Sequence, residues 1–149
     1  MTKIILNKDY GGFGLSYAAY KLYAKKKGIN LFVYERAAIK DGYDGFTYKK
    51  VDKPSNDFSA YYTNKDFGDV VILDDVKVSK DFYETYSLNL NRDMRADPTL
   101  IEVVEELGSA ADGWAAKLVI VEVPDEVAAD YEIDDYDGFE TLHQKVQVW

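Results

Sequence analysis

The sequence contains no cysteine and only one histidine, His143, among its 149 residues. Disulfides, thiolate zinc sites and cysteine nucleophiles are therefore excluded, as is a metal site built from several histidines. The aliphatic runs, such as residues 118–121, fall far short of the about 18 residues that a membrane span requires. Residues 1–7 read as a strand and not as a basic-then-apolar signal peptide, so we expect a protein that stays in the cytosol.

Positive charge is also scarce. Lysine and arginine number 18 against 27 aspartates and glutamates, which gives a formal charge of −9 and a pI near 4.6. Such a surface repels duplex nucleic acid unless its basic residues gather on one face, and the lysine runs at 21–27 and 49–53 are typical of solvent-exposed segments. We expect neither duplex nucleic acid nor a membrane as a partner. With 47% hydrophobic residues, the chain is expected to fold as a single domain, 1–149.

The hydrophobic pattern predicts an α+β fold: one mixed-sheet domain with two main helices, an N-terminal β-α-β unit and a C-terminal β-hairpin. Ser16 is the expected N-cap of a helix over 17–27 that Gly28 ends, and Asp97 and Pro98 open a second helix that Gly108 ends. The pair Asp137-Gly138 marks the hairpin turn. The expected strands span 3–6, 31–34, 43–51, 70–73, 118–123, 131–136 and 139–149, and residues 82–90 read as extended.

A glycine-rich turn links the first strand to the first helix. Successive glycines before a helix N-terminus let backbone N–H groups converge on an anion. Glu35 follows Gly14 by 21 residues, the position of the ribose-binding carboxylate in a dinucleotide-binding fingerprint, although the third glycine of that fingerprint is missing. The turn is thus either a tight structural connection with Phe13 packed inward or an anion-binding contact. Its candidate ligand-binding residues are Tyr10, Gly11, Gly12, Phe13, Gly14 and Ser16.

The second candidate segment runs from Asn89 to Asp97, directly before the second helix. Arg92 and Arg95 are two of only three arginines in the chain, and guanidinium groups suit phosphate oxygens and ring stacking. Asn91 is placed to read amide-like edges of a ligand. The structural alternative is that both arginines pair with nearby carboxylates, Asp93 and Asp97 first.

The remaining polar groups form no catalytic set. The aspartate pairs at 74–75 and 134–135 lack the spacing of a calcium loop, and neighbouring residues of a strand point to opposite faces. For His143 we expect a structural or solvent-facing role. The sequence therefore predicts a protein that is not an enzyme and has no metal and no cofactor.

Four segments occur together in this chain: the glycine turn at 10–16, the helix at 97–108, the strand at 118–125, and the turn at Tyr136 to Gly138 followed by the terminal Trp149. As a set they resemble a family of small uncharacterised proteins encoded by tailed bacteriophages. The resemblance covers the first quarter and the last third of the chain and does not extend to residues 37–86. It implies a phage origin and action in the host cytoplasm, and it brings no catalytic residues.

Three functional hypotheses follow. The first is a phage counter-defence protein that sequesters a small anionic nucleotide-type immune signal, such as a cyclic nucleotide or a cyclic ADP-ribose derivative, without chemistry. The second is an acidic protein that inhibits a host protein, possible defence proteins included, by direct binding or DNA mimicry. The third is a metal-dependent enzyme acting on nucleotides through Glu35 or the aspartate pairs.

The C-terminal strand also bears on assembly. Residues 145–149 continue an edge strand with apolar side chains at alternating positions, and such edges are usually paired or covered. We expect a homo-oligomer with the strand 139–149 at or near the interface. The alternative is that Trp149 packs on its own core.

Overall fold

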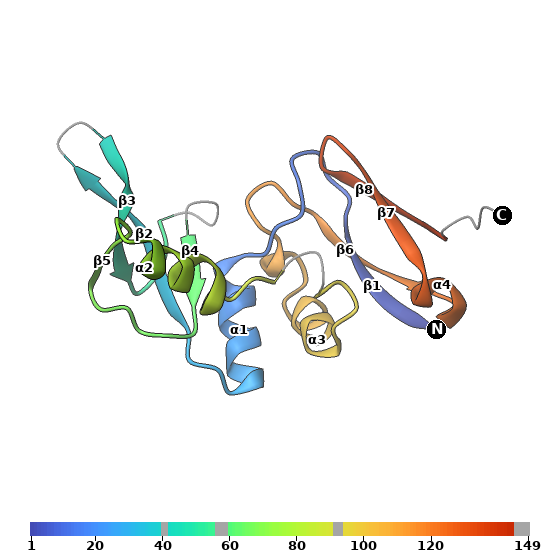
Figure 1. Ribbon diagram of the computed structural model, residues 1–149. Coiled ribbons are helices and arrows are strands. Elements are labelled where there is room, and N and C mark those ends of the chain that lie inside the picture. The colour runs from blue at the N-terminus through green and yellow to red at the C-terminus, as the bar shows by residue number, and fades with distance from the viewer. Residues whose placement is uncertain (40–41, 56–59, 91–93, 145–149) are drawn as a thin grey trace. The chain divides into compact units, whose positions relative to one another are not determined.

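The computed structural model describes residues 1–39, 42–55, 60–90 and 94–144, and it divides the chain into two compact units. Unit 1 comprises Met1–Tyr23 and Leu90–Trp149, and unit 2 comprises Ala24–Asn89. Both units combine helices with strands, which confirms the α+β class (Figure 1). Every strand pair in the described ranges is antiparallel. In the same ranges, no helix is long and apolar enough to cross a membrane.

Unit 1 is built around a two-stranded ribbon of β1 and β6, with Ile5 opposite Ile120. Helix α3 supplies Leu100, Ile101 and Val104 to the core. The side chain of Glu140 on β8 accepts a hydrogen bond from the backbone N–H of Asn7, so β8 lies against the end of β1. The hairpin of β7 and β8 carries the turn expected at 137–138. The elements of this unit are β1 (Thr2–Asn7), α1 (Tyr17–Lys27, which continues into unit 2), α3 (Pro98–Leu107), η4 (Gly108–Ala111), β6 (Leu118–Val123), α4 (Asp125–Ala129), β7 (Tyr131–Tyr136) and β8 (Phe139–Gln144).

The helix ends follow the capping residues. The Ser16 hydroxyl accepts a hydrogen bond from the Ala19 N–H at 3.2 Å, and the Asp97 carboxylate accepts one from the Leu100 N–H at 2.9 Å. Gly28 and Gly108 end their helices at φ +67° and +58°, a conformation that glycine adopts without a Cβ clash. All these cap predictions are confirmed.

Unit 2 is a four-stranded sheet in the order β4-β2-β3-β5, with two short helical turns. Its centre is aromatic, because Tyr34, Tyr48 and Phe82 are almost fully buried and their rings pack at centroid distances of 5.2–5.4 Å. Val71 and Leu73 complete this cluster. The elements are β2 (Phe32–Ile39), β3 (Gly42–Val51), β4 (Ala60–Thr63), β5 (Val70–Ile72), α2 (Val76–Lys80) and the π-helical turn η2 (Asp81–Thr85).

Two expectations need correction. Residues 82–90 are not an extended, half-exposed strand, because Asp81–Thr85 is helical and Phe82 is only 1% exposed. The order strand, helix, strand at the N-terminus is as expected, but β1 and β2 do not pair with each other. Instead β1 pairs with β6, and β2 lies between β3 and β4. Pairing with a distant strand leaves no pattern in the local sequence.

The N-cap of α3 gives a first prediction. Replacing Asp97→Ala removes the acceptor for the Leu100 N–H, and we expect a loss of about 1 kcal/mol in the free energy of unfolding, measured by urea titration. Asp97→Asn retains a capping oxygen and is the matched control, with a change of only a few tenths of a kcal/mol. Equal stabilities for the two variants would contradict the cap.

Candidate functional site

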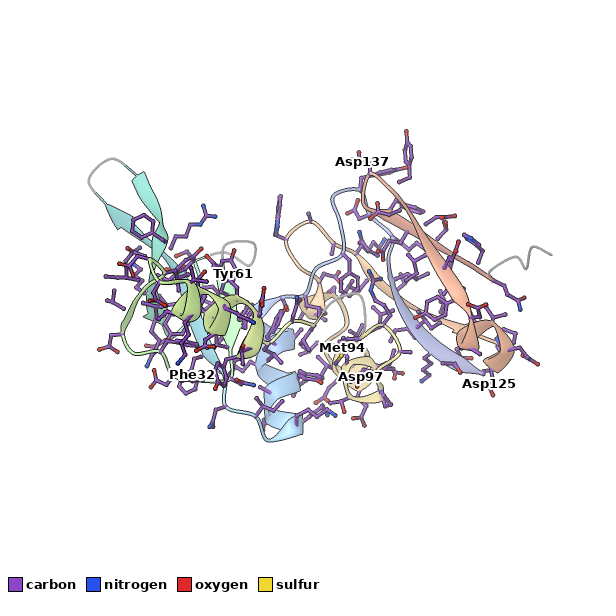
Figure 2. All side chains as sticks on the ribbon, in the orientation of Figure 1. Phe32, Tyr61, Met94, Asp97, Asp125 and Asp137 are labelled. Atoms are coloured by element: carbon purple, nitrogen blue, oxygen red, sulfur yellow. The ribbon has the colours of Figure 1, made fainter. Side chains whose placement is uncertain are left out.

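The glycine turn is filled by the protein's own hairpin. The N–H of Gly11 donates to the carbonyl of Asp137 at 2.8 Å, and a Cβ on Gly138 would overlap the backbone nitrogens of Gly11 and Gly12. On the other side, the carbonyl of Gly14 accepts from the N–H of Gly113 at 3.0 Å. The glycines therefore allow three backbone segments to approach one another closely. Figure 2 labels Asp137 at the hairpin tip that makes this contact.

Arg95 lies next to this turn and is buried in an ion pair. Its Nη1 and Nη2 donate to Oε1 and Oε2 of Glu140 at 2.6 and 2.8 Å, and both side chains are about 5% exposed. Nη1 also donates to the carbonyl of Ile5. The ring of Phe13 lies against the guanidinium, with its centroid 3.7 Å from Cζ. The structural alternative for Arg95 is therefore realised with Glu140 and not with the nearby aspartates, because the hairpin returns to β1.

A buried asparagine extends this arrangement. The backbone N–H of Asn7 donates to Oε1 of Glu140, while its side chain donates to the carbonyls of Asp9 and Gly138 and accepts from the N–H of Lys117. Asn7 thus connects β1, β6 and the hairpin. We call Asn7, Arg95 and Glu140, with the ring of Phe13, the buried polar network.

The other predicted ligand-binding residues divide into two groups. Tyr10 is exposed and packs against Phe139, while Ser16 donates from its hydroxyl to the carbonyl of Ala110 and caps α1. Asn91 and Arg92 lie outside the described residues. The structure thus brings Phe13 and Arg95 together, but the Arg95 charge is neutralised by Glu140. Ligand binding by these residues stays a prediction.

Unit 2 contains a cluster that the sequence analysis missed. Tyr48 and Tyr83 share a hydrogen bond between their hydroxyls at 2.9 Å, and the ring of Tyr61 lies 5.2–5.3 Å from both (Tyr61 is labelled in Figure 2). Burial, followed by the hydrogen bond with Tyr48, raises the pKa of Tyr83 well above its ordinary value of 10. A hydrogen bond with the Tyr48 hydroxyl raises the pKa of Arg36, which is exposed on β2. We call these four side chains the Arg36–tyrosine cluster.

The sequence contained one signal for this cluster. Arg36 is one of only three arginines in the chain, and it follows Tyr34 by two residues. The residues that surround it come from β3, β4 and η2, which are distant in sequence. Strand register brings them together, since Arg36 lies opposite Tyr48 and Tyr61 lies opposite Tyr34.

Charge is divided unequally between the units. Unit 2 has eleven acidic and eleven basic residues, whereas unit 1 has sixteen acidic and seven basic ones, so the whole formal charge of −9 belongs to unit 1. Residues 118–144 contain no lysine or arginine. They carry nine carboxylates, all exposed except Glu140: Glu122, Asp125, Glu126, Asp130, Glu132, Asp134, Asp135, Asp137 and Glu140.

His143 lies within this acidic stretch and contacts two of its carboxylates. Its Nε2 is 3.2 Å from Glu132 and its Nδ1 is 3.1 Å from Asp134, both on the neighbouring strand β7. The imidazole is half-exposed, in agreement with the expected solvent-facing position.

The carboxylates considered for metal-dependent chemistry are dispersed. Glu35 is buried and accepts hydrogen bonds from the N–H and hydroxyl of Ser55. Within the described ranges, no three aspartate, glutamate or histidine side chains are grouped to hold a metal ion. Comparison of the chain with protein families, curated proteins and solved structures found no match.

The buried polar network gives the second prediction. Glu140→Gln keeps an acceptor for the Asn7 N–H but leaves the Arg95 charge buried and uncompensated, so we expect the free energy of unfolding to fall by about 3–5 kcal/mol. The double variant Arg95→Met with Glu140→Gln should lose less than the single one, because no isolated charge remains. Urea titration measures both.

The exposed pair of Lys3 and Glu105 provides a control, since Glu105→Gln should change stability by less than about 1 kcal/mol. If Glu140→Gln had an effect as small as this control, the Arg95 charge would not depend on its partner.

Proposed function

We propose that this protein acts by binding and not by catalysis, and that its partner is a basic protein held by the acidic surface of unit 1. We define the acidic surface as the exposed carboxylates of α4, β7 and the hairpin turn: Asp125, Glu126, Asp130, Glu132, Asp134, Asp135 and Asp137. The observation that carries the proposal is the concentration of the whole net charge in unit 1, with no lysine or arginine between residues 118 and 144.

The arrangement of these carboxylates favours recognition of a surface that binds phosphates. Side chains on one face of a strand repeat about every 6.6 Å, so Glu132 and Asp134 present a regular row of negative charge on β7. Asp125 and Asp137 extend the surface from α4 to the hairpin turn (Figure 2). A field of one sign accelerates association with a basic partner and makes binding dependent on salt. Nucleic-acid-binding proteins are such partners, and mimicry of a phosphate backbone is the mechanism we propose.

The resemblance to proteins of tailed bacteriophages suggests where the protein would act and which kind of partner it would bind. With a phage origin, the protein would act in the host cytoplasm and its partner would be a basic host protein, such as a nuclease or a defence protein. The buried polar network supports the hairpin that carries much of the acidic surface, because it joins β8 to β1 and to Arg95. A fixed surface loses less entropy on binding than a mobile one.

A charge variant tests the function. We expect the wild-type protein to capture a basic protein from host lysate in stoichiometric amount at about 0.05 M salt and to release it at about 0.5 M salt. The variant Glu132→Gln, Asp134→Asn and Asp135→Asn should lose this partner. The matched control carries Asp52→Asn, Asp69→Asn and Asp81→Asn in unit 2, outside the recess described below, and should retain it. Absence of a stoichiometric partner, or equal capture by both variants, would contradict the proposal.

A second candidate is the sequestration of a small anionic nucleotide-type signal, and the Arg36–tyrosine cluster is the observation that favours it. A guanidinium suits a phosphate, and neighbouring tyrosine rings suit a base. Unit 2 is neutral overall, so an anion is not repelled by its net charge. This site differs from the glycine turn that the sequence indicated.

Isothermal titration with a panel of cyclic nucleotides and cyclic ADP-ribose derivatives tests the second candidate. We expect one of them to bind with a Kd below about 10 µM, and Arg36→Gln to weaken binding at least about tenfold. Lys49→Gln, on the neighbouring strand, is the control and should leave the Kd unchanged. Failure of every ligand to bind would remove this candidate and leave the first one intact.

A further inference from the structure

Most of the large apolar side chains that are exposed in the described residues belong to unit 2. Of the nine large hydrophobic residues that are exposed in the described part of the chain, five lie in β3, β5, α2 and η2 or directly beside them. They are Phe46, Val70, Ile72, Val76 and Tyr83, with exposed fractions between 37% and 86%. Val70 and Ile72 are two residues apart on β5 and therefore lie on the same face of the sheet, and neighbouring exposed apolar side chains mark an interaction surface.

The backbone of β5 is open along one edge. Among the described residues, β5 is the last strand of the order β4-β2-β3-β5, so its other edge has no strand partner there. The N–H of Lys50 donates to Asp69, and the N–H of Leu73 donates to Phe46, which places residues 69, 71 and 73 in hydrogen-bonded pairs with β3. In an antiparallel ladder the intervening residues point their N–H and C=O groups the other way. Val70 and Ile72 therefore present their backbone donors and acceptors at the open edge.

A recess follows the end of β5. It has a volume of about 550 Å³, and Leu73, Val76 and Tyr83 give it apolar walls. Its lining contains three carboxylates, those of Asp74, Asp75 and Glu84, and one ammonium group, that of Lys80. The Asp75 carboxylate already caps α2. Within the described residues, the carboxylates of Asp74 and Glu84 form no ion pair, and they offer negative charge to a ligand. An apolar wall with an acidic rim suits a lysine or arginine side chain, whose stem is apolar and whose head is charged.

We propose that β5 accepts an extended, basic segment of a partner protein as an additional strand. The segment would form backbone hydrogen bonds with Val70 and Ile72, pack apolar side chains on theirs, and place a lysine or arginine in the recess. This is the strand-addition mode of peptide recognition. The proposal uses residues of unit 2 alone and does not depend on the acidic surface of unit 1.

The charges favour this occupant over a second copy of the chain. Two copies paired antiparallel about Val71 would place Asp69 of one copy opposite Leu73 of the other, at the recess that Asp74, Asp75 and Glu84 line. Carboxylates would then face carboxylates across the new pair, which is destabilising in a sheet. A basic segment would instead place its positive charge beside the carboxylates of Asp74 and Glu84.

A peptide titration tests the proposal. The probe is a labelled peptide of about seven residues, Thr-Val-Lys-Val-Arg-Val-Thr, which alternates apolar and polar side chains. We expect it to bind the full-length protein with a Kd of about 10–100 µM by fluorescence anisotropy, and to shift the amide NMR signals of Val70 and Ile72. Replacing its lysine and arginine by glutamate should weaken binding at least about tenfold. Methylation of its alternate backbone nitrogens on one edge should also abolish binding.

Protein variants locate the site. Ile72→Lys should abolish binding of the basic peptide, and Asp74→Asn should weaken it several-fold. Tyr136→Lys changes an exposed aromatic residue of unit 1 and is the matched control, which should bind normally. The Glu132, Asp134 and Asp135 variant of the acidic surface should also bind normally, so failure of that surface is distinguishable from failure of this one.

Three results would overturn the proposal. The first is no binding of the basic peptide to the wild-type protein, which does not depend on whether any variant folds. The second is equal binding of a scrambled peptide of the same charge, because attraction would then need no strand. The third is a dimer in light scattering that Ile72→Lys dissociates, because the edge would then pair with a second copy.

Discussion

The ion pair between Arg95 and Glu140 is the interaction on which unit 1 depends. Burying two charges is costly, and they are stable together because both carboxylate oxygens and both terminal guanidinium nitrogens are used. Glu140 also accepts the N–H of Asn7, so a single carboxylate connects β8 to β1 and to the segment before α3. Removing either charge leaves the other isolated in the core. The glycines at 11, 12 and 138 contribute to the same contact. Because they have no Cβ, they allow the hairpin turn to approach the glycine turn closely enough for the ion pair to form.

This arrangement separates two kinds of carboxylate in the same stretch of chain. Glu140 points inward and is neutralised by Arg95, whereas the carboxylates of β7 point outward without lysine or arginine nearby in sequence. The exposed charges repel one another and reduce stability, a cost that favours a functional reason for keeping them together. Unit 2 has the opposite character. Its charges balance, its core is aromatic, and its distinctive surface is an apolar strand edge.

Much of the local structure could be predicted because its causes lie within a few residues. Ser16 and Asp97 accept hydrogen bonds from N–H groups three residues ahead, and Gly28 and Gly108 occupy positions with positive φ. The Asp137-Gly138 turn is likewise a local signal. The turn η2 was missed because Phe82 and Tyr83 are typical of strands, and they are helical here because the aromatic core of unit 2 surrounds Phe82.

The sequence by itself determined the α+β class, the ends of the main helices, the hairpin and the acidic balance, since composition, capping and turn chemistry act locally. Tertiary structure alone decided the partner of β1, the partner of Arg95 and the neighbours of Arg36. The sequence offered Arg95 two nearby aspartates, yet its carboxylate comes from 45 residues away. Such pairings depend on which distant strands meet, and the free energy that selects them is gained only when the whole unit is packed.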